Sequence, residues 1–178
     1  MMFIPGIIIA VVTFPGVIIH EAAHQLFCRL CGVAVYEVKY FQFDLTTQGY
    51  VLHGGTKNFG ESFLISVGPF LLNTLLCFLI CIPASLPYQV FGDRNPVTYA
   101  LLWLGVSIGM HAFPSTGDAS GLWEQAVASA KKLNILAIIS FPIIVLIFVA
   151  NVLRVIWFDA LYGFFIGIIV PTFIFKHL

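Results

Sequence analysis

Two histidines and a glutamate interrupt an apolar run near the start of the chain, in the stretch VIIHEAAHQL (residues 17–26). His20 and His24 are four residues apart, so on a helix they project from one face and can share a Zn²⁺ ion. Glu21 is adjacent and can act as general base toward water bound to that ion, because zinc lowers the pKa of such water toward ~7. The alternative is that both histidines are buried and only hydrogen-bond to carbonyl groups. Ionisable side chains each cost roughly 2.5–3.5 kcal/mol at the centre of a membrane helix on insertion scales. Three such residues together on one helix end are costly without a function, which favours a hydrolytic zinc site.

The composition is that of a membrane protein. Of the 178 residues, 60% are hydrophobic and 9% are charged, whereas soluble domains carry about 25% charged residues. The formal net charge is zero, which argues against nucleic acid as a partner. The length fits a single membrane-embedded domain over residues 1–178.

The apolar runs predict an all-α polytopic membrane protein with about five transmembrane helices. The predicted spans are residues 3–27, 63–82, 97–113, 133–152 and 160–175. Between the first two, AVYEVKYFQF (34–43) and YVLH (50–53) are rich in β-branched and aromatic residues and flank a turn-like segment, which predicts a small β-hairpin. This is either a simple interfacial hairpin or a docking strand for an extended peptide. Residues 120–132 have the apolar spacing of an interfacial helix.

The distribution of basic residues predicts an orientation in the cell membrane. If the five spans alternate, one side carries Arg29, Lys39, Lys57, Lys131, Lys132 and Lys176, and the other carries Arg94 and Arg154. Basic loops tend to stay in the cytoplasm, so the count places the N-terminus outside and the C-terminus and the hairpin inside.

A catalytic zinc site usually has three protein ligands, so a third is expected near the histidine pair. The third span runs in the same direction as the first, and it brings His111 and, after a Pro-Ser-Thr-Gly break, Asp118 to a similar depth. Asp118 could be this ligand or could form a helix capping box with Ser115. His111 could be a ligand, an oxyanion donor or a residue that holds a ligand in place. Asn73 could bind substrate backbone or join two helices.

These motifs together resemble the site-2 protease family of intramembrane zinc metalloproteases. The resemblance rests on HEAAH (20–24), the β-rich segment, GPFLLN (68–73) and HAFPSTGD (111–118), and it covers residues 3–125. It implies zinc held by His20, His24 and Asp118, with Glu21 as the catalytic base. His111 stands where the family usually has asparagine, and Asp118 is followed by Ala119 and not by glycine.

The resemblance therefore predicts a zinc metalloendopeptidase that cuts membrane-protein or peptide substrates at or within the lipid bilayer. Residues 133–178 would form two additional helices outside the metalloprotease core. Two other functions remain open. A metal-ion transporter would also place histidine and aspartate in membrane helices, although internal repeats and a midplane site would be expected. A catalytically inactive membrane scaffold would have kept the fold and lost the chemistry. The pattern specifies neither a substrate sequence nor an oligomeric state.

Overall fold

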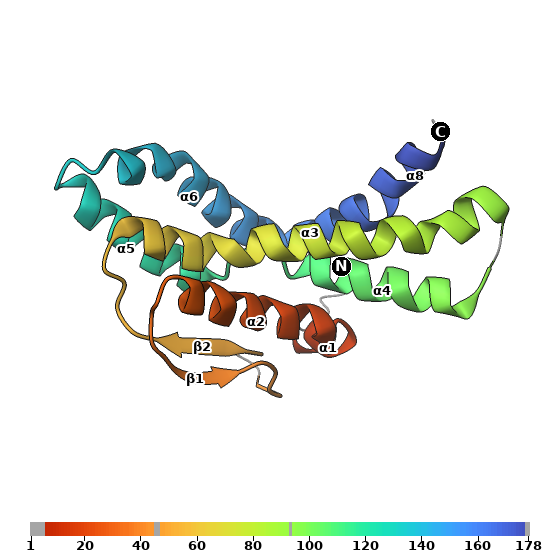
Figure 1. Cartoon of the computed structure of the whole chain (residues 1–178), viewed down its shortest axis with the longest axis horizontal. Coiled ribbons are helices and arrows are strands. Elements are labelled where there is room, and N and C mark those ends of the chain that lie inside the picture. The colour runs from red at the N-terminus through yellow and green to blue at the C-terminus, as the bar shows by residue number, and fades with distance from the viewer. Residues whose placement is uncertain (1–5, 45–46, 93, 177–178) are drawn as a thin grey trace.

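The structure is a computed structural model that describes residues 6–44, 47–92 and 94–176. It is mostly helical (Figure 1). The helices are α1 (Gly6–Val12), α2 (Phe14–Leu30), α3 (Phe59–Phe91), α4 (Pro96–Met110), α5 (Thr116–Ala130), α6 (Ile135–Leu153), α7 (Phe158–Phe164) and α8 (Val170–Lys176). A 3₁₀ turn (Arg154–Ile156) follows α6, and a π-helical turn (Phe165–Ile169) joins α7 to α8.

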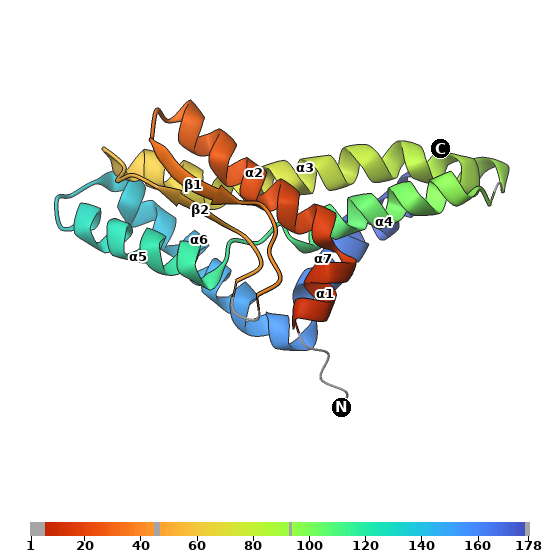
Figure 2. The ribbon, with the colours of Figure 1, turned by 90° about the horizontal axis from the view of Figure 1, so that it is seen from below.

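The predicted β-hairpin is confirmed. Strands β1 (Val35–Lys39) and β2 (Tyr50–His53) pair antiparallel, with Val35 opposite His53 and Lys39 opposite Tyr50. The hairpin packs against α2 (Figure 2). It is thereby placed beside the helix that carries His20 and His24.

Helix α3 is the axis on which α2, α4, α5, α6 and α8 pack. Its 33 residues extend about 50 Å at 1.5 Å per residue. Helix α2 contacts its N-terminal half, and α4 runs back along its C-terminal half (Figure 1). At Gly16 a Cβ atom would collide with the Ser107 carbonyl oxygen, so the glycine permits the close approach of α2 to α4.

Helix α5 continues the path of α4 toward the N-terminal end of α3, after a break at residues 111–115. Its apolar face forms a buried core with the start of α3 and with α6, made of Phe59, Ala119, Leu122, Ala126, Ala137, Ile144 and Ile147. Trp123 packs edge-on against Phe141 and Phe148 of α6. The segment predicted as an interfacial helix is therefore helical, but it lies antiparallel against α6 (Figure 2).

The C-terminal segment from α6 to α8 follows the direction of α3. At its start Leu136 lies beside Gly60, further along the Tyr162 and Thr74 hydroxyl groups are 2.8 Å apart, and near its end the Gln89 amide donates to the Thr172 hydroxyl at 2.8 Å. The helical path is interrupted between α6 and α7 at Trp157, whose φ of 64° lies in the left-handed region. The fourth and fifth predicted spans therefore do not return on one another as an antiparallel pair.

The predicted number of five spans is not confirmed. Within the described ranges, three helical segments are long and apolar enough to cross a membrane: Phe59–Phe91, Ile135–Ile156 and Phe158–Lys176. The pair α1–α2 raises the number to four if it counts as one broken span, and α4 is apolar but only 15 residues long.

The first predicted span is not one straight helix. Its residues 3–5 lie outside the described residues, and the rest is bent by 87° between α1 and α2. The bend occurs at Thr13, whose hydroxyl donates to the Ile9 carbonyl, and Pro15 then lies in the first turn of α2. Proline lacks the N–H that would continue α1 through this point, so a new helix begins here.

The packing also separates basic residues that the sequence count grouped together. Lys131 and Lys132 follow the end of α5, which packs on the N-terminal end of α3, whereas Lys176 ends α8 near the opposite end of α3 (Figure 1). Arg154 lies between these ends, beside the break in the α4–α5 path. If α3 crosses the bilayer, Lys176 and Lys131 lie on opposite sides, contrary to the predicted orientation.

This arrangement predicts that Lys131→Cys and Lys176→Cys are labelled from opposite sides of the membrane. The measurement is reaction with an impermeant maleimide in sealed vesicles, before and after permeabilisation. The background should carry Cys31→Ser, because Cys31 is the partly exposed one of the four free cysteines. Labelling of both positions from the same side would instead support the five-span orientation.

Candidate metal centre

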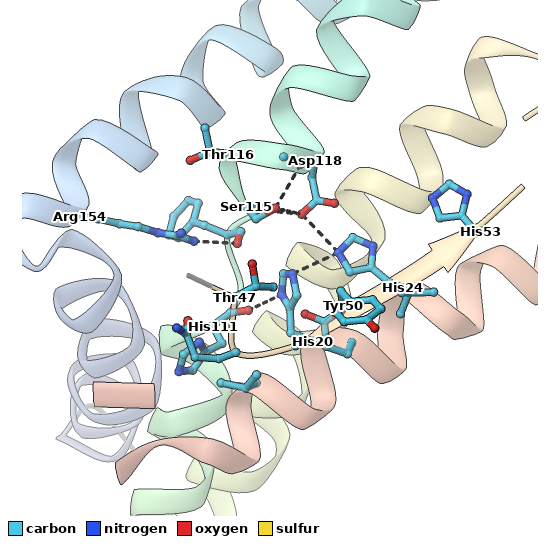
Figure 3. Close-up of a pocket in the computed structure, with 17 residues that line it drawn as sticks. His20, His24, Thr47, Tyr50, His53, His111, Ser115, Thr116, Asp118 and Arg154 are labelled. Atoms are coloured by element: carbon cyan, nitrogen blue, oxygen red, sulfur yellow. Dashed lines mark hydrogen bonds and ion pairs between the residues drawn. The ribbon is translucent and has the colours of Figure 1, made fainter. Parts of the chain in front are cut away.

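The two histidines of α2 point their Nε2 atoms toward each other (Figure 3). His20 Nδ1 is 2.6 Å from the His111 carbonyl oxygen, and His24 Nδ1 is 2.9 Å from the Ile65 carbonyl oxygen. A carbonyl can only accept, so both Nδ1 atoms carry the proton and donate it. In the neutral rings each Nε2 then presents a lone pair, and the two atoms are 3.2 Å apart.

Asp118 brings a carboxylate to the same point. Its Oδ2 lies 3.4 Å from His24 Nε2, and the ligand atoms of His20, His24 and Asp118 all lie within 4.8 Å of one another. Two lone pairs and a carboxylate in this arrangement repel each other unless a cation, a proton or a metal ion, lies between them. In a tetrahedral zinc site with ligands at 2.0–2.1 Å, neighbouring ligand atoms are about 3.3 Å apart. The three residues could therefore hold a metal ion.

Asp118 also caps α5, so the capping role considered for it from the sequence is present, and the same residue belongs to the group that could hold a metal ion. Ser115 N donates to Asp118 Oδ2 at 2.8 Å, and Asp118 N donates to Ser115 Oγ at 3.1 Å. The Ser115 hydroxyl is also 2.6 Å from Oδ2. Burial alone would raise the pKa of the Asp118 carboxyl, but the imidazoles of His24 and His20 and the Ser115 hydroxyl keep that pKa below its usual range. The cap fixes the carboxylate on the side that faces His24.

His111 lies outside this group and acts on it through its backbone. Its carbonyl accepts from His20 Nδ1 and, at 3.0 Å, from Asn73 Nδ2. Its ring is turned toward the α1–α2 bend, where Nε2 is 2.8 Å from the Thr13 hydroxyl oxygen. Of the roles considered for His111, holding a ligand in place is the one that these contacts support.

Asn73 joins two helices. It is fully buried in α3, and its Nδ2 also donates to the Ile108 carbonyl of α4 at 3.3 Å. It does not line the cavity beside His20, His24 and Asp118. Between substrate binding and helix packing, its contacts are those of packing.

Glu21 is buried next to the two histidines and lines a cavity of about 500 Å³ together with His20, His24 and Asp118. The hairpin forms one wall, through Thr47, Gln48, Gly49, Tyr50, Val51 and His53. At Gly49 a Cβ atom would lie 2.7 Å from Glu21 Cγ, so only glycine lets the hairpin approach the glutamate this closely.

Two further residues of this region, Arg154 and Asn151, were not among the site residues predicted from the sequence. Arg154 lines the cavity from the end of α6, and its Nη2 donates to the Phe113 carbonyl at 3.1 Å (Figure 3). Asn151 Nδ2 donates to the Pro114 carbonyl at 3.1 Å. Polar residues at the end of a strongly apolar run are a signal that could have pointed to them.

No protein-family model, curated protein or solved structure matches this chain. The resemblance to the site-2 protease family therefore rests on the motifs of the sequence. A function is therefore inferred from the geometry of the site.

Proposed function

We propose that this protein is an intramembrane zinc metalloprotease, similar to the site-2 proteases, that hydrolyses peptide bonds of membrane-associated substrates. One observation carries the proposal. Two imidazole Nε2 atoms and a carboxylate oxygen converge at 3.2 and 3.4 Å, while the Nδ1 protons of both rings are committed to backbone carbonyls. Metal-binding histidines characteristically donate their second ring N–H in this way.

The donor set favours zinc among the common metals. Two imidazoles and one carboxylate suit Zn²⁺ with a fourth position open, whereas Ca²⁺ and Mg²⁺ prefer six or more oxygen ligands. Imidazole also binds copper, iron and nickel, so the choice of zinc is part of the proposal.

Each residue around the site would then have a distinct role in hydrolysis. Zinc held by His20, His24 and Asp118 would supply a polarised water molecule and a positive charge for the carbonyl oxygen of the scissile bond. Glu21 would accept a proton from this water as its oxygen attacks the carbonyl carbon. Glu21 would then give the proton to the leaving nitrogen as the C–N bond breaks, which yields a carboxylic acid and an amine. The carbonyls of His111 and Ile65 keep the rings of His20 and His24 oriented throughout.

A substrate would have to reach the cavity in an extended form. The cavity lies beside the break between α4 and α5 and the break between α6 and α7, with hairpin residues 47–51 on one side. Irregular backbone at membrane depth is tolerated where it lines a wet cavity, so a water supply for hydrolysis is compatible with the bilayer. We infer that the hairpin wall takes the substrate as an added strand.

The experiment that tests the proposal measures the metal bound to the purified protein. We expect about one zinc per chain in the wild type and a loss of most of it in His24→Ala, because two ligands remain. His53→Ala is the matched control: His53 lines the same cavity, but its Nδ1 donates to its neighbour's carbonyl, Gly54 O, at 2.8 Å and it is not part of the ligand group. A wild-type protein without transition metal, or equal metal in His24→Ala, would overturn the proposed site. Metal without any hydrolysis would point to the transporter or the scaffold.

A further inference from the structure

In the break between α4 and α5, the backbone carbonyls of His111, Phe113 and Pro114 accept from side chains of other segments. Residues 111–115 connect the end of α4 to the cap of α5, and Pro114 within them is fully buried. In apolar surroundings an unpaired carbonyl costs several kcal/mol. The carbonyls of this segment therefore need donors from elsewhere in the chain.

The last turn of α6 and the 3₁₀ turn that follows it supply two of these donors. Asn151 Nδ2 donates to Pro114 O and Arg154 Nη2 donates to Phe113 O, each at 3.1 Å. The two side chains are three residues apart, so they lie on one face of the helix end and reach adjacent carbonyls. The second hydrogen of Asn151 Nδ2 goes to the Ile147 carbonyl at 3.0 Å, which fixes the amide with its nitrogen toward the break. Asp159 lies 3.8 Å from Arg154 Nε and holds the guanidinium from the other side.

This segment leads directly into the third residue of the metal-binding group. Ser115 follows Pro114, and its backbone N–H and hydroxyl hold Asp118 Oδ2, the oxygen that faces His24. A shift of the Phe113–Pro114 backbone would therefore move Ser115, and with it the carboxylate.

From these contacts we propose that Asn151 and Arg154 position Asp118 for metal binding, so that α6, which lies outside the core covered by the family resemblance, is part of the metal centre without contributing a ligand. We call the two residues the α6 clamp. The inference rests on the proposed metal site. It assigns a role to the C-terminal helices, which the sequence left without one.

The test is a double-mutant cycle on zinc affinity in detergent, read by competition with a chromophoric zinc chelator. Asn151→Ala should weaken zinc binding by about tenfold or more, as is typical for residues that orient metal ligands. In the Asp118→Ala background the same substitution should have no further effect, because the clamp acts through Asp118. Asn151 is uncharged, so its replacement leaves the net charge around the metal unchanged. Gln89→Ala is the control, since it removes a similar helix–helix hydrogen bond, to Thr172, far from the site. It should leave zinc affinity as in the wild type.

The cycle separates this inference from a merely structural role and from the proposed function. If Asn151→Ala binds zinc as the wild type does, or weakens it equally with and without Asp118, the clamp is refuted while the metal site stands. If the wild type binds no zinc, the proposed function fails first. Helix content by circular dichroism reports folding, and if Asn151→Ala misfolds the cycle is run with Arg154→Lys. That variant keeps the charge and loses the planar fork of donors, and the same two outcomes support or overturn the proposal.

Discussion

Glu21→Gln should abolish hydrolysis while the protein keeps its metal. The amide has nearly the shape of the carboxylate, so its packing against Gly49 is preserved. It cannot accept the proton of the attacking water, and loss of a general base costs at least ~10²-fold in rate. The measurement is cleavage of single-span reporter peptides co-reconstituted with the protein in liposomes, with zinc content determined on the same samples.

A charge-matched control accompanies this prediction. Glu124 lies exposed on α5, away from the cavity residues, so Glu124→Gln should cleave the reporters at the wild-type rate. If Glu21→Gln is as active as the wild type, Glu21 is not the base and the protease mechanism proposed above is wrong. If it loses zinc as well as activity, Glu21 contributes to metal binding.

Asp118→Asn should remove most of the bound zinc, whereas His111→Ala should leave it bound. Asparagine keeps an oxygen that can accept from Ser115, so α5 retains its cap while the site loses its only negative ligand. His111→Ala removes a ring that bonds Thr13 but keeps the backbone carbonyl that orients His20. Zinc per chain, measured by atomic absorption on the purified variants, distinguishes the two.

Ser115→Ala tests whether the cap and the ligand can be separated. It removes the capping hydroxyl, which typically costs ~1 kcal/mol of stability, and leaves the carboxylate in place. We expect weaker zinc binding but not its loss. If instead zinc is lost in His111→Ala and retained in Asp118→Asn, the third ligand is wrongly assigned.

Much of the site could be predicted from spacing because its elements are local. His20 and His24 face one another across one turn of α2, as any i, i+4 pair on a helix must. The hairpin followed from β-branched and aromatic residues on both sides of a turn, and the apolar runs correspond to helical segments in the described parts of the chain. Asp118 was one of two candidates for the third ligand, and its capping role follows from the three-residue spacing to Ser115.

What the sequence by itself determined is which segments prefer lipid, which residues can bind a metal and which of them share a helix face. Composition indicates the cost of placing a segment in hydrocarbon, but it does not specify how one segment is oriented relative to another. The 87° bend at Thr13 and the parallel course of residues 135–176 along α3 are therefore set by packing. The tertiary structure also distinguishes His111 from Asp118: Asp118 joins His20 and His24 in a group that could hold a metal ion, whereas the His111 ring turns toward Thr13 and its carbonyl accepts from His20. Backbone carbonyls are the same in every residue, so a side-chain pattern cannot reveal that those of His111, Phe113 and Pro114 accept from His20, Arg154 and Asn151. Arg154 and Asn151 reach these carbonyls from more than thirty residues further along the chain, and only the folded arrangement brings them there.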